Sequence, residues 1–192
     1  MSKAVIASLK PYFYYFVGEG IKKIEVRKSE PKADDWNRET YFYMSKDEKS
    51  FAKIPKEYQD KYRKHFGKVG LKFMCDRIDE IFPCAYGTGV DIWSEFFIST
   101  ERFCKKSCLT EQEIANYMGG KSGYGWHISD LKIYDKPKEL SEFRTICEGI
   151  KCDGCEYYYV ENNESMGLFK DCLCGCEKPI KRPPQSWCYC EE

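Results

Sequence analysis

The sequence predicts an α+β fold: a small β-barrel of five to six strands with flanking helices and a cysteine-rich insertion. Three observations favour this fold. The predicted strands are short and sequential, and helices are inserted between them without a regular β–α alternation. Hydrophobic residues make up 42% of the 192 positions and charged residues 32%, as in globular proteins. The length suits one ordinary domain.

The first quarter of the chain contains three predicted strands and one helix. Ala4 to Leu9 is a short apolar run that ends before a lysine and a proline. The proline suits the first turn of a helix over residues 11–17, which Gly18 and Gly20 close. Residues 23–28 alternate apolar and charged side chains, which is typical of a half-buried strand. Residues 40–44 (TYFYM) are rich in strand formers and predict the third strand.

The middle of the chain predicts one helix and one long strand. Residues 54–66 (IPKEYQDKYRKHF) fit a short amphipathic helix that ends at Gly67. Residues 68–81 (KVGLKFMCDRIDEI) predict a long strand that bends at Gly70. The glycine-containing stretch PCAYGTGVD that follows predicts a loop.

The second half of the chain predicts another helix and two more strands. Thr110 and Glu113 form a capping box at the start of LTEQEIANYMGG, and the two glycines close that helix. Residues 123–135 (GYGWHISDLKIYD) predict a strand, and residues 136–143 a polar turn. The last segment, RPPQSWCYCEE, predicts a diproline turn into a short final strand.

Charge and hydropathy exclude several classes of protein. The net charge is +0, so a nucleic-acid contact would need a local basic patch. The apolar run in MSKAVIASLK is too short for a signal peptide. No run approaches the roughly 18 apolar residues of a membrane span. We therefore expect a cytoplasmic protein with no membrane partner, whose thiols are kept reduced.

Several segments together resemble one known family. The stretch SLKPYFYYFVGEGIKKIEVRK, residues 8–28, contains a G-x-K-x-x-E-x-R pattern at Gly20, Lys22, Glu25 and Arg27. With PKADDW, TYFYMSK, GKVGLKFMCDRIDEI, GWHISDLKIYDKPKELSEF and RPPQSWCYCEE in order, the chain is similar to the ASCH domain, a branch of the PUA-like superfamily. It resembles the longer ASCH-like proteins of Gram-positive bacteria and their phages. The resemblance implies a single domain over residues 1–192, with a cysteine-rich insertion at 147–178.

The resemblance also implies a PUA-like barrel whose first helix lies beside a positively charged groove. Because the family binds RNA or nucleotides, the expected partner is RNA, a nucleotide or a modified nucleoside. One small bacterial member hydrolyses N4-acetylcytidine with a lysine at the Lys22 position, a threonine at the Glu25 position and a later glutamate. Other members resemble ribonucleases. The alternatives to a binding module are thus a nucleoside amidohydrolase or ribonuclease, and a protein-interaction or phage anti-defence factor.

Lys22, Glu25 and Arg27 are the central candidates for the ligand-binding site. A groove for a phosphate or a base needs a lysine as a point charge and an arginine as a planar fork. A carboxylate between them can orient both, or accept a hydrogen bond from a base amino group. In an enzyme, Lys22 and Glu25 would be the catalytic residues, with the lysine as base or charge stabiliser and the glutamate as general acid or base. The alternative is a solvated strand edge with surface ion pairs.

Three further residues complete the candidate ligand-binding set. Ser8 and Lys10 lie at the end of the first predicted strand and can face the same cleft. The resemblance places the segment that contains Trp187 near the groove. An indole ring there can stack on a base, which is worth about 1–3 kcal/mol per base.

The chain has 12 cysteines, and five of them resemble a zinc knuckle. Cys152 and Cys155 form a C-x-x-C turn, and Cys172, Cys174 and Cys176 form a second cluster. Two such turns place thiolates on one side of each loop, which suits a closed structural zinc site. We expect a pair from the second cluster to complete the tetrahedron. Free structural thiols, disulfides and an iron–sulfur cluster are the alternatives.

Overall fold

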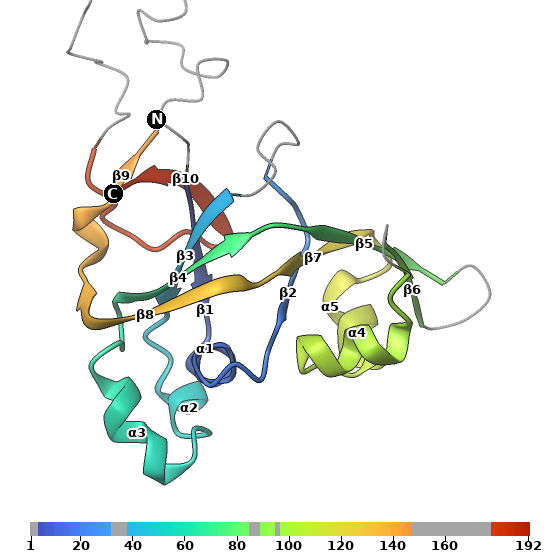
Figure 1. The fold of residues 1–192 in the computed structure, drawn as a ribbon, viewed down its shortest axis with the longest axis horizontal. Coiled ribbons are helices and arrows are strands. Elements are labelled where there is room, and N and C mark those ends of the chain that lie inside the picture. The colour runs from blue at the N-terminus through green and yellow to red at the C-terminus, as the bar shows by residue number, and fades with distance from the viewer. Residues whose placement is uncertain (1–3, 32–37, 85–88, 95–96, 147–177) are drawn as a thin grey trace, which may run out of the picture.

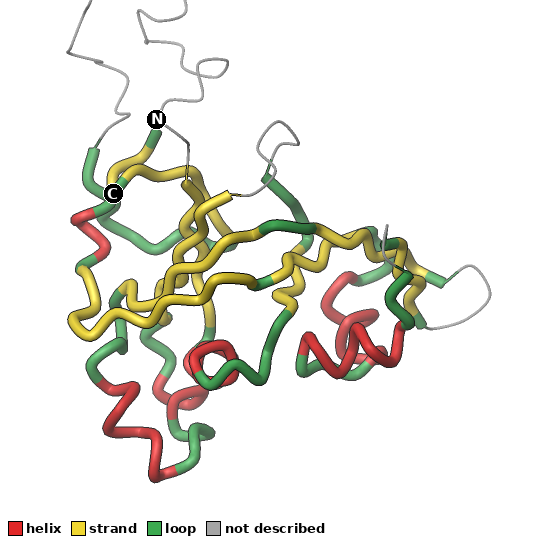
Figure 2. Tube along the Cα trace, in the orientation of Figure 1, coloured by secondary structure: helices red, strands yellow, loops and turns green. Residues whose placement is uncertain are grey.

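The computed structural model describes residues 4–31, 38–84, 89–94, 97–146 and 178–192 (Figures 1 and 2). Its strands are β1 (Ala4–Leu9), β2 (Ile24–Arg27), β3 (Arg38–Met44), β4 (Val69–Cys75), β5 (Ile78–Pro83), β6 (Val90–Trp93), β7 (Gly123–His127), β8 (Ser129–Lys138), β9 (Arg144–Thr145) and β10 (Trp187–Glu191). Its helices are α1 (Pro11–Gly18), α2 (Glu48–Phe51), α3 (Lys56–Arg63), α4 (Thr100–Ser107) and α5 (Glu111–Met118), with a 3-10 turn at Leu140–Glu142.

The strands form two sheets, which confirms the α+β class but not a closed barrel. The larger sheet has the order β8-β4-β3-β1-β10-β9, and the smaller has the order β2-β7-β5-β6. Within the larger sheet β1 pairs parallel with β3 and antiparallel with β10, so the first and last strands of the chain are neighbours in it. The predicted barrel of five to six strands was wrong in its closure, because ten described strands divide between two open sheets.

The two sheets are joined because two long strands each change sheet. β4 continues into β5 and β7 continues into β8, and β4 pairs with β8 while β5 pairs with β7. The change occurs at Arg77, whose carbonyl accepts a hydrogen bond from His127 N (2.9 Å). His127 Nε2 also lies 2.6 Å from Oδ2 of the buried Asp79. The strands predicted over 68–81 and 123–135 are therefore two strands each; Gly70 produces only a local register shift.

Three helices were predicted in position, and other elements were missed. α1, α3 and α5 lie where the sequence predicts them, and the Thr110–Glu113 capping box is present. The structure adds α4, in a stretch for which no helix or strand was predicted, and β6, which begins in a predicted loop. α4 has a serine N-cap, Ser99, whose side chain accepts a hydrogen bond from Arg102 N. This cap is the local signal that could have predicted the helix.

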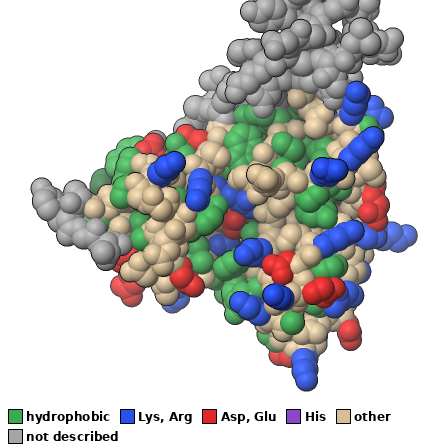
Figure 3. All heavy atoms as spheres, turned by 180° about the vertical axis from the view of Figure 1, so that it is seen from behind, with side chains coloured by type: hydrophobic (Ala, Val, Ile, Leu, Met, Phe, Trp, Pro, Cys, Tyr) green, Lys and Arg blue, Asp and Glu red, His purple; other side chains and the backbone are tan. Residues whose placement is uncertain are grey.

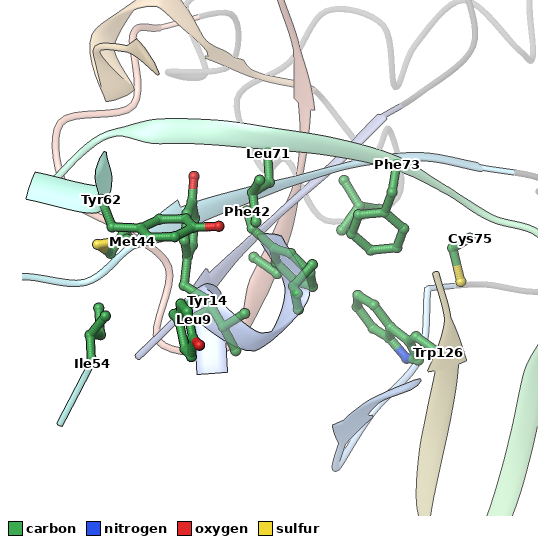
Figure 4. Packing of buried hydrophobic residues seen from close by; sticks show 14 of the residues in the cluster. Leu9, Tyr14, Phe42, Met44, Ile54, Tyr62, Leu71, Phe73, Cys75 and Trp126 are labelled. Atoms are coloured by element: carbon green, nitrogen blue, oxygen red, sulfur yellow. The ribbon is translucent and has the colours of Figure 1, made fainter. Parts of the chain in front are cut away.

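The core is rich in aromatic side chains and lies mainly between the larger sheet and helices α1 to α3. Tyr14, Phe42, Leu71, Phe73 and Trp126 belong to one buried cluster (Figure 4). A separate cluster fills the space between the smaller sheet and helices α4 and α5, which lie together against that sheet in Figure 1. Among the described residues, no helix is long and apolar enough to span a membrane.

Candidate ligand-binding site

Three charged residues of the β2 region are buried together. Lys22, Glu25 and Arg27 are 2%, 6% and 5% exposed; we call them the β2 trio. Ile24 and Val26 of β2 pack into the cluster that includes α4 and α5, so the charged side chains of the strand lie on its other side, where Arg27 contacts the end of β1 and the loop before β10. All four residues of the strand are buried, so its charged face is not the solvated edge that alternation alone allows. Buried charges are rare unless they are paired.

The carboxylate of Glu25 lies between two cations. Its Oε2 is 3.4 Å from Lys22 Nζ, and its Oε1 is 3.0 Å from Arg27 Nε. Lys22 Nζ also donates a hydrogen bond of 2.5 Å to Ser107 O, at the C-terminal end of α4. Burial lowers the pKa of Lys22 below its ordinary value, and the Glu25 carboxylate opposes part of that change. The trio thus places a lysine with a lowered pKa beside a carboxylate.

Arg27 builds one wall of the site. Its two terminal nitrogens donate to Ser186 O (3.0 Å) and Ser8 O (2.7 Å). Ser8 Oγ donates in turn to Pro184 O (2.7 Å), and Ser8 N to Ser186 O (3.2 Å). These bonds fix the loop before β10 against the end of β1. The Arg27 guanidinium, which was expected to bind a phosphate, therefore already donates hydrogen bonds to backbone carbonyls.

The trio lines a pocket of about 440 Å³. Lys10 and Phe13 of the α1 region, Glu113 and Tyr117 of α5, and Gln185 of the loop before β10 form other parts of its wall. Seen from behind, the molecule has a hollow between the part that carries α4 and α5 and the larger body, with acidic and basic side chains side by side (Figure 3). The pocket therefore offers both apolar rings and charged groups to a ligand.

The structure brings five of the six predicted ligand-binding residues to this pocket. Ser8, Lys10 and the β2 trio all line it. Trp187 is not among the lining residues. Its ring packs against Trp126 and Tyr189, with centroids 6.1 and 5.3 Å away, and its Nε1 donates to Ser29 Oγ (3.0 Å).

Sequence reasoning missed eight lining residues, among them Phe13, Glu113, Tyr117 and Gln185. Phe13 and Gln185 lie within the segments that carry the ASCH resemblance, so their position near the other candidates was a usable signal. Glu113 and Tyr117 are four residues apart and therefore lie on one face of α5. Nothing in the sequence indicates that this face meets β2.

The predicted zinc site lies outside the described residues. This holds for Cys152, Cys155, Cys172, Cys174 and Cys176 and for most of the insertion. Within the described ranges, no group of three or more His, Cys, Asp or Glu side chains is arranged to hold a metal ion. The zinc site and the insertion remain predictions.

Two solved structures are similar to the whole chain, whereas no family model and no curated protein sequence matches it. The first is a crystal structure of ASCH from Zymomonas mobilis, and the second is a serine-to-alanine mutant of that protein. Each has a TM-score of 0.52 and 14% identity, and the match covers 100% of this chain and 90% of the other. This chain has the ASCH fold. The ASCH resemblance is thus confirmed at the level of the fold, although the predicted barrel is not closed, and Lys22, Glu25 and Arg27 of the G-x-K-x-x-E-x-R pattern line the pocket.

Proposed function

We propose that the pocket at the β2 trio binds one nucleotide unit of an RNA, or a free nucleotide or nucleoside. The observation that carries this proposal is the position of the buried trio in the wall of a pocket that also has aromatic residues. The ASCH fold, a PUA-like fold of a nucleic-acid-binding kind, supports the same reading. A volume of about 440 Å³ lies within the range of small-ligand pockets.

The lining residues supply complementary groups for each part of such a ligand. Phe13 and Tyr117 offer ring faces on which a base can stack. Glu25 has acceptor capacity beyond its two ion pairs, because a carboxylate can accept about four hydrogen bonds. Lys10 is exposed at the rim and can pair with a phosphate. Gln185 presents both a donor and an acceptor to a base or ribose edge.

The test is a binding titration of a fluorescein-labelled eight-nucleotide RNA and of unlabelled nucleosides at two salt concentrations. We expect saturable binding of RNA that weakens with salt. The Phe13→Leu variant should lose affinity by about tenfold or more, because it removes the ring face but keeps an apolar side chain. The matched control is Phe66→Leu, outside the pocket, which should bind as the unaltered protein does. Absence of binding, or equal binding by both variants, would contradict the proposal.

An enzyme that uses the same pocket is the second candidate. The observation that favours it is the lowered pKa of Lys22 beside the Glu25 carboxylate, because a buried pair with shifted protonation is typical of catalytic sites. In hydrolysis of an acylated nucleoside, Glu25 would take a proton from water as the water oxygen bonds to the acyl carbon. Lys22 would stabilise the negative charge on the acyl oxygen. The C–N bond then breaks, and the amine leaves with the proton from Glu25.

Mass spectrometry of the protein with acylated nucleosides and short RNAs separates the two candidates. An enzyme converts a substrate, and the Lys22→Met variant retains its fold but loses the conversion. A binding module retains a ligand without converting it. The exposed Lys49→Met variant is the control for a lost lysine charge.

A further inference from the structure

The smaller sheet has a second surface, made of aromatic and acidic side chains on one face. In register, Trp93 of β6 lies opposite Glu80 of β5, and Glu80 lies opposite Tyr124 of β7. Two residues along β5, Phe82 lies opposite Asp91 of β6. Because side chains two residues apart in a strand point to the same side, all five share one face. We call these five residues the aromatic–acidic face.

This face is the one that helices α4 and α5 do not cover. The alternate residues of the same strands, Ile81 and Val90, are buried with Phe103 of α4 and Ile114 of α5. Trp93, in contrast, is 57% exposed and Phe82 is 39% exposed. The two rings are diagonal neighbours across a strand pair, so they form one apolar surface. None of the five residues lines the pocket at the β2 trio.

The carboxylates of this surface have no cationic partner in the part of the chain that the structure describes. Each ion pair among the described residues joins other side chains, so neither Glu80 nor Asp91 is paired with a basic side chain of that part of the chain. Glu30, which follows β2, adds a third carboxylate nearby: burial and the charge of Glu80 both raise the pKa of Glu30. A cation that binds here would therefore be attracted by carboxylates that no basic side chain of the described residues neutralises.

We propose that the aromatic–acidic face is a docking site for an arginine-containing segment of a partner protein. A guanidinium can stack on an indole or phenol ring and pair with a carboxylate at the same time. The five residues span three strands, spaced about 4.8 Å apart, so several side chains of an extended peptide can reach them together. The same carboxylates repel a phosphate backbone, which separates this surface from the nucleotide pocket.

The test uses a defined probe, the peptide Gly-Arg-Gly-Arg-Gly-Arg-Gly, titrated into the ¹⁵N-labelled full chain at low salt. We expect amide shifts confined to β5, β6 and β7. The double variant Glu80→Gln/Asp91→Asn should weaken binding by about tenfold, because it removes two ion pairs. Trp93→Ala should weaken binding as well. The control Glu57→Gln/Asp60→Asn removes the same charge from α3 and should leave binding unchanged.

Three outcomes would overturn the inference. They are the absence of binding, an equal loss in the α3 control, and shifts centred away from these strands. Binding of an eight-nucleotide oligouridylate at the same strands would assign the face to nucleic acid instead. All altered side chains of the face are exposed or partly exposed, so the variants should fold. Since the pocket is separate, failure here leaves the proposed nucleotide binding untouched.

Discussion

Glu25 Oε1 and Arg27 Nε lie 3.0 Å apart, and both side chains are almost completely buried. Two residues apart on β2, they point to the same side of the strand, toward the end of β1 and the loop before β10. Lys22 completes the group from the turn that precedes the strand. The Glu25 carboxylate therefore separates two buried cations, and its removal should leave them mutually repelling.

The first prediction concerns Glu25→Gln. This change keeps the side-chain shape but removes the anion, and it should lower the free energy of unfolding by about 3–5 kcal/mol. Urea denaturation of both proteins at pH 7 measures the difference. The control is Glu48→Gln, which breaks the exposed pair with Arg63 and should cost less than about 1 kcal/mol. A similar cost for both variants would mean that the trio is better hydrated than its burial indicates.

The sequence could predict the trio but not the pocket around it. Glu25 and Arg27 are two residues apart on one strand, so alternation places them on the same side, and Lys22 is near them in the turn that precedes the strand. Tyr117 and Gln185 reach the same pocket only through tertiary packing, which periodicity does not encode. Trp187 shows the reverse case: its segment was expected at the site, but the period of the final strand directs the ring toward Trp126.

Similar reasoning explains the error in the fold. Residues 68–81 have the composition of one continuous strand, and local propensity gives no reason to divide them. The division depends on Asp79 and His127, which meet across two strands at the bend and lie far apart in the sequence. A barrel predicted from strand count alone could not include this contact. The capping box of α5, in contrast, is a local device and was predicted correctly.

The second prediction concerns the pH dependence of stability at His65. Burial, together with Lys64 and Lys61, lowers the pKa of His65 to about 4. Because the unfolded chain has the ordinary value of 6.5, it binds the proton first as the pH falls. The stability contributed by neutral His65 should therefore be lost as the pH falls from about 6.5 to about 4. The size of this loss is on the order of 2–3 kcal/mol.

Unfolding of the original protein and of His65→Gln across this pH range checks the second prediction. The variant also loses the contact with Tyr14, whose Oη lies 3.1 Å from His65 Nδ1, but that cost is independent of pH in this range. The stability difference between the two proteins should shrink on acidification. A constant difference would show that His65 does not titrate with the folding transition.

The third prediction concerns Gly70, which allows β4 to approach the Tyr14–His65 pair. A Cβ atom at this position would collide with His65 Nδ1 and lie 2.6 Å from Tyr14 Oη. Both partners are buried, so neither can move away freely. Gly70→Ala should lower the free energy of unfolding by about 1–3 kcal/mol. Thermal unfolding measures this loss of stability, and an unchanged unfolding midpoint would contradict the prediction.

The fourth prediction concerns Arg27→Lys. It tests whether Arg27 acts by holding the loop before β10 through hydrogen bonds or only through its positive charge. The lysine keeps the cation beside Glu25 but has no planar fork, so it cannot bond Ser8 O and Ser186 O together. We expect amide hydrogen exchange of residues 185–187 to become about tenfold faster or more, because the loop before β10 loses this support. Ligand affinity should fall with it, since Gln185 belongs to that loop. The control Arg63→Lys, at an exposed pair in α3, should change neither quantity. If exchange stays slow while affinity falls, Arg27 contacts the ligand directly, and its bonds to the backbone are secondary.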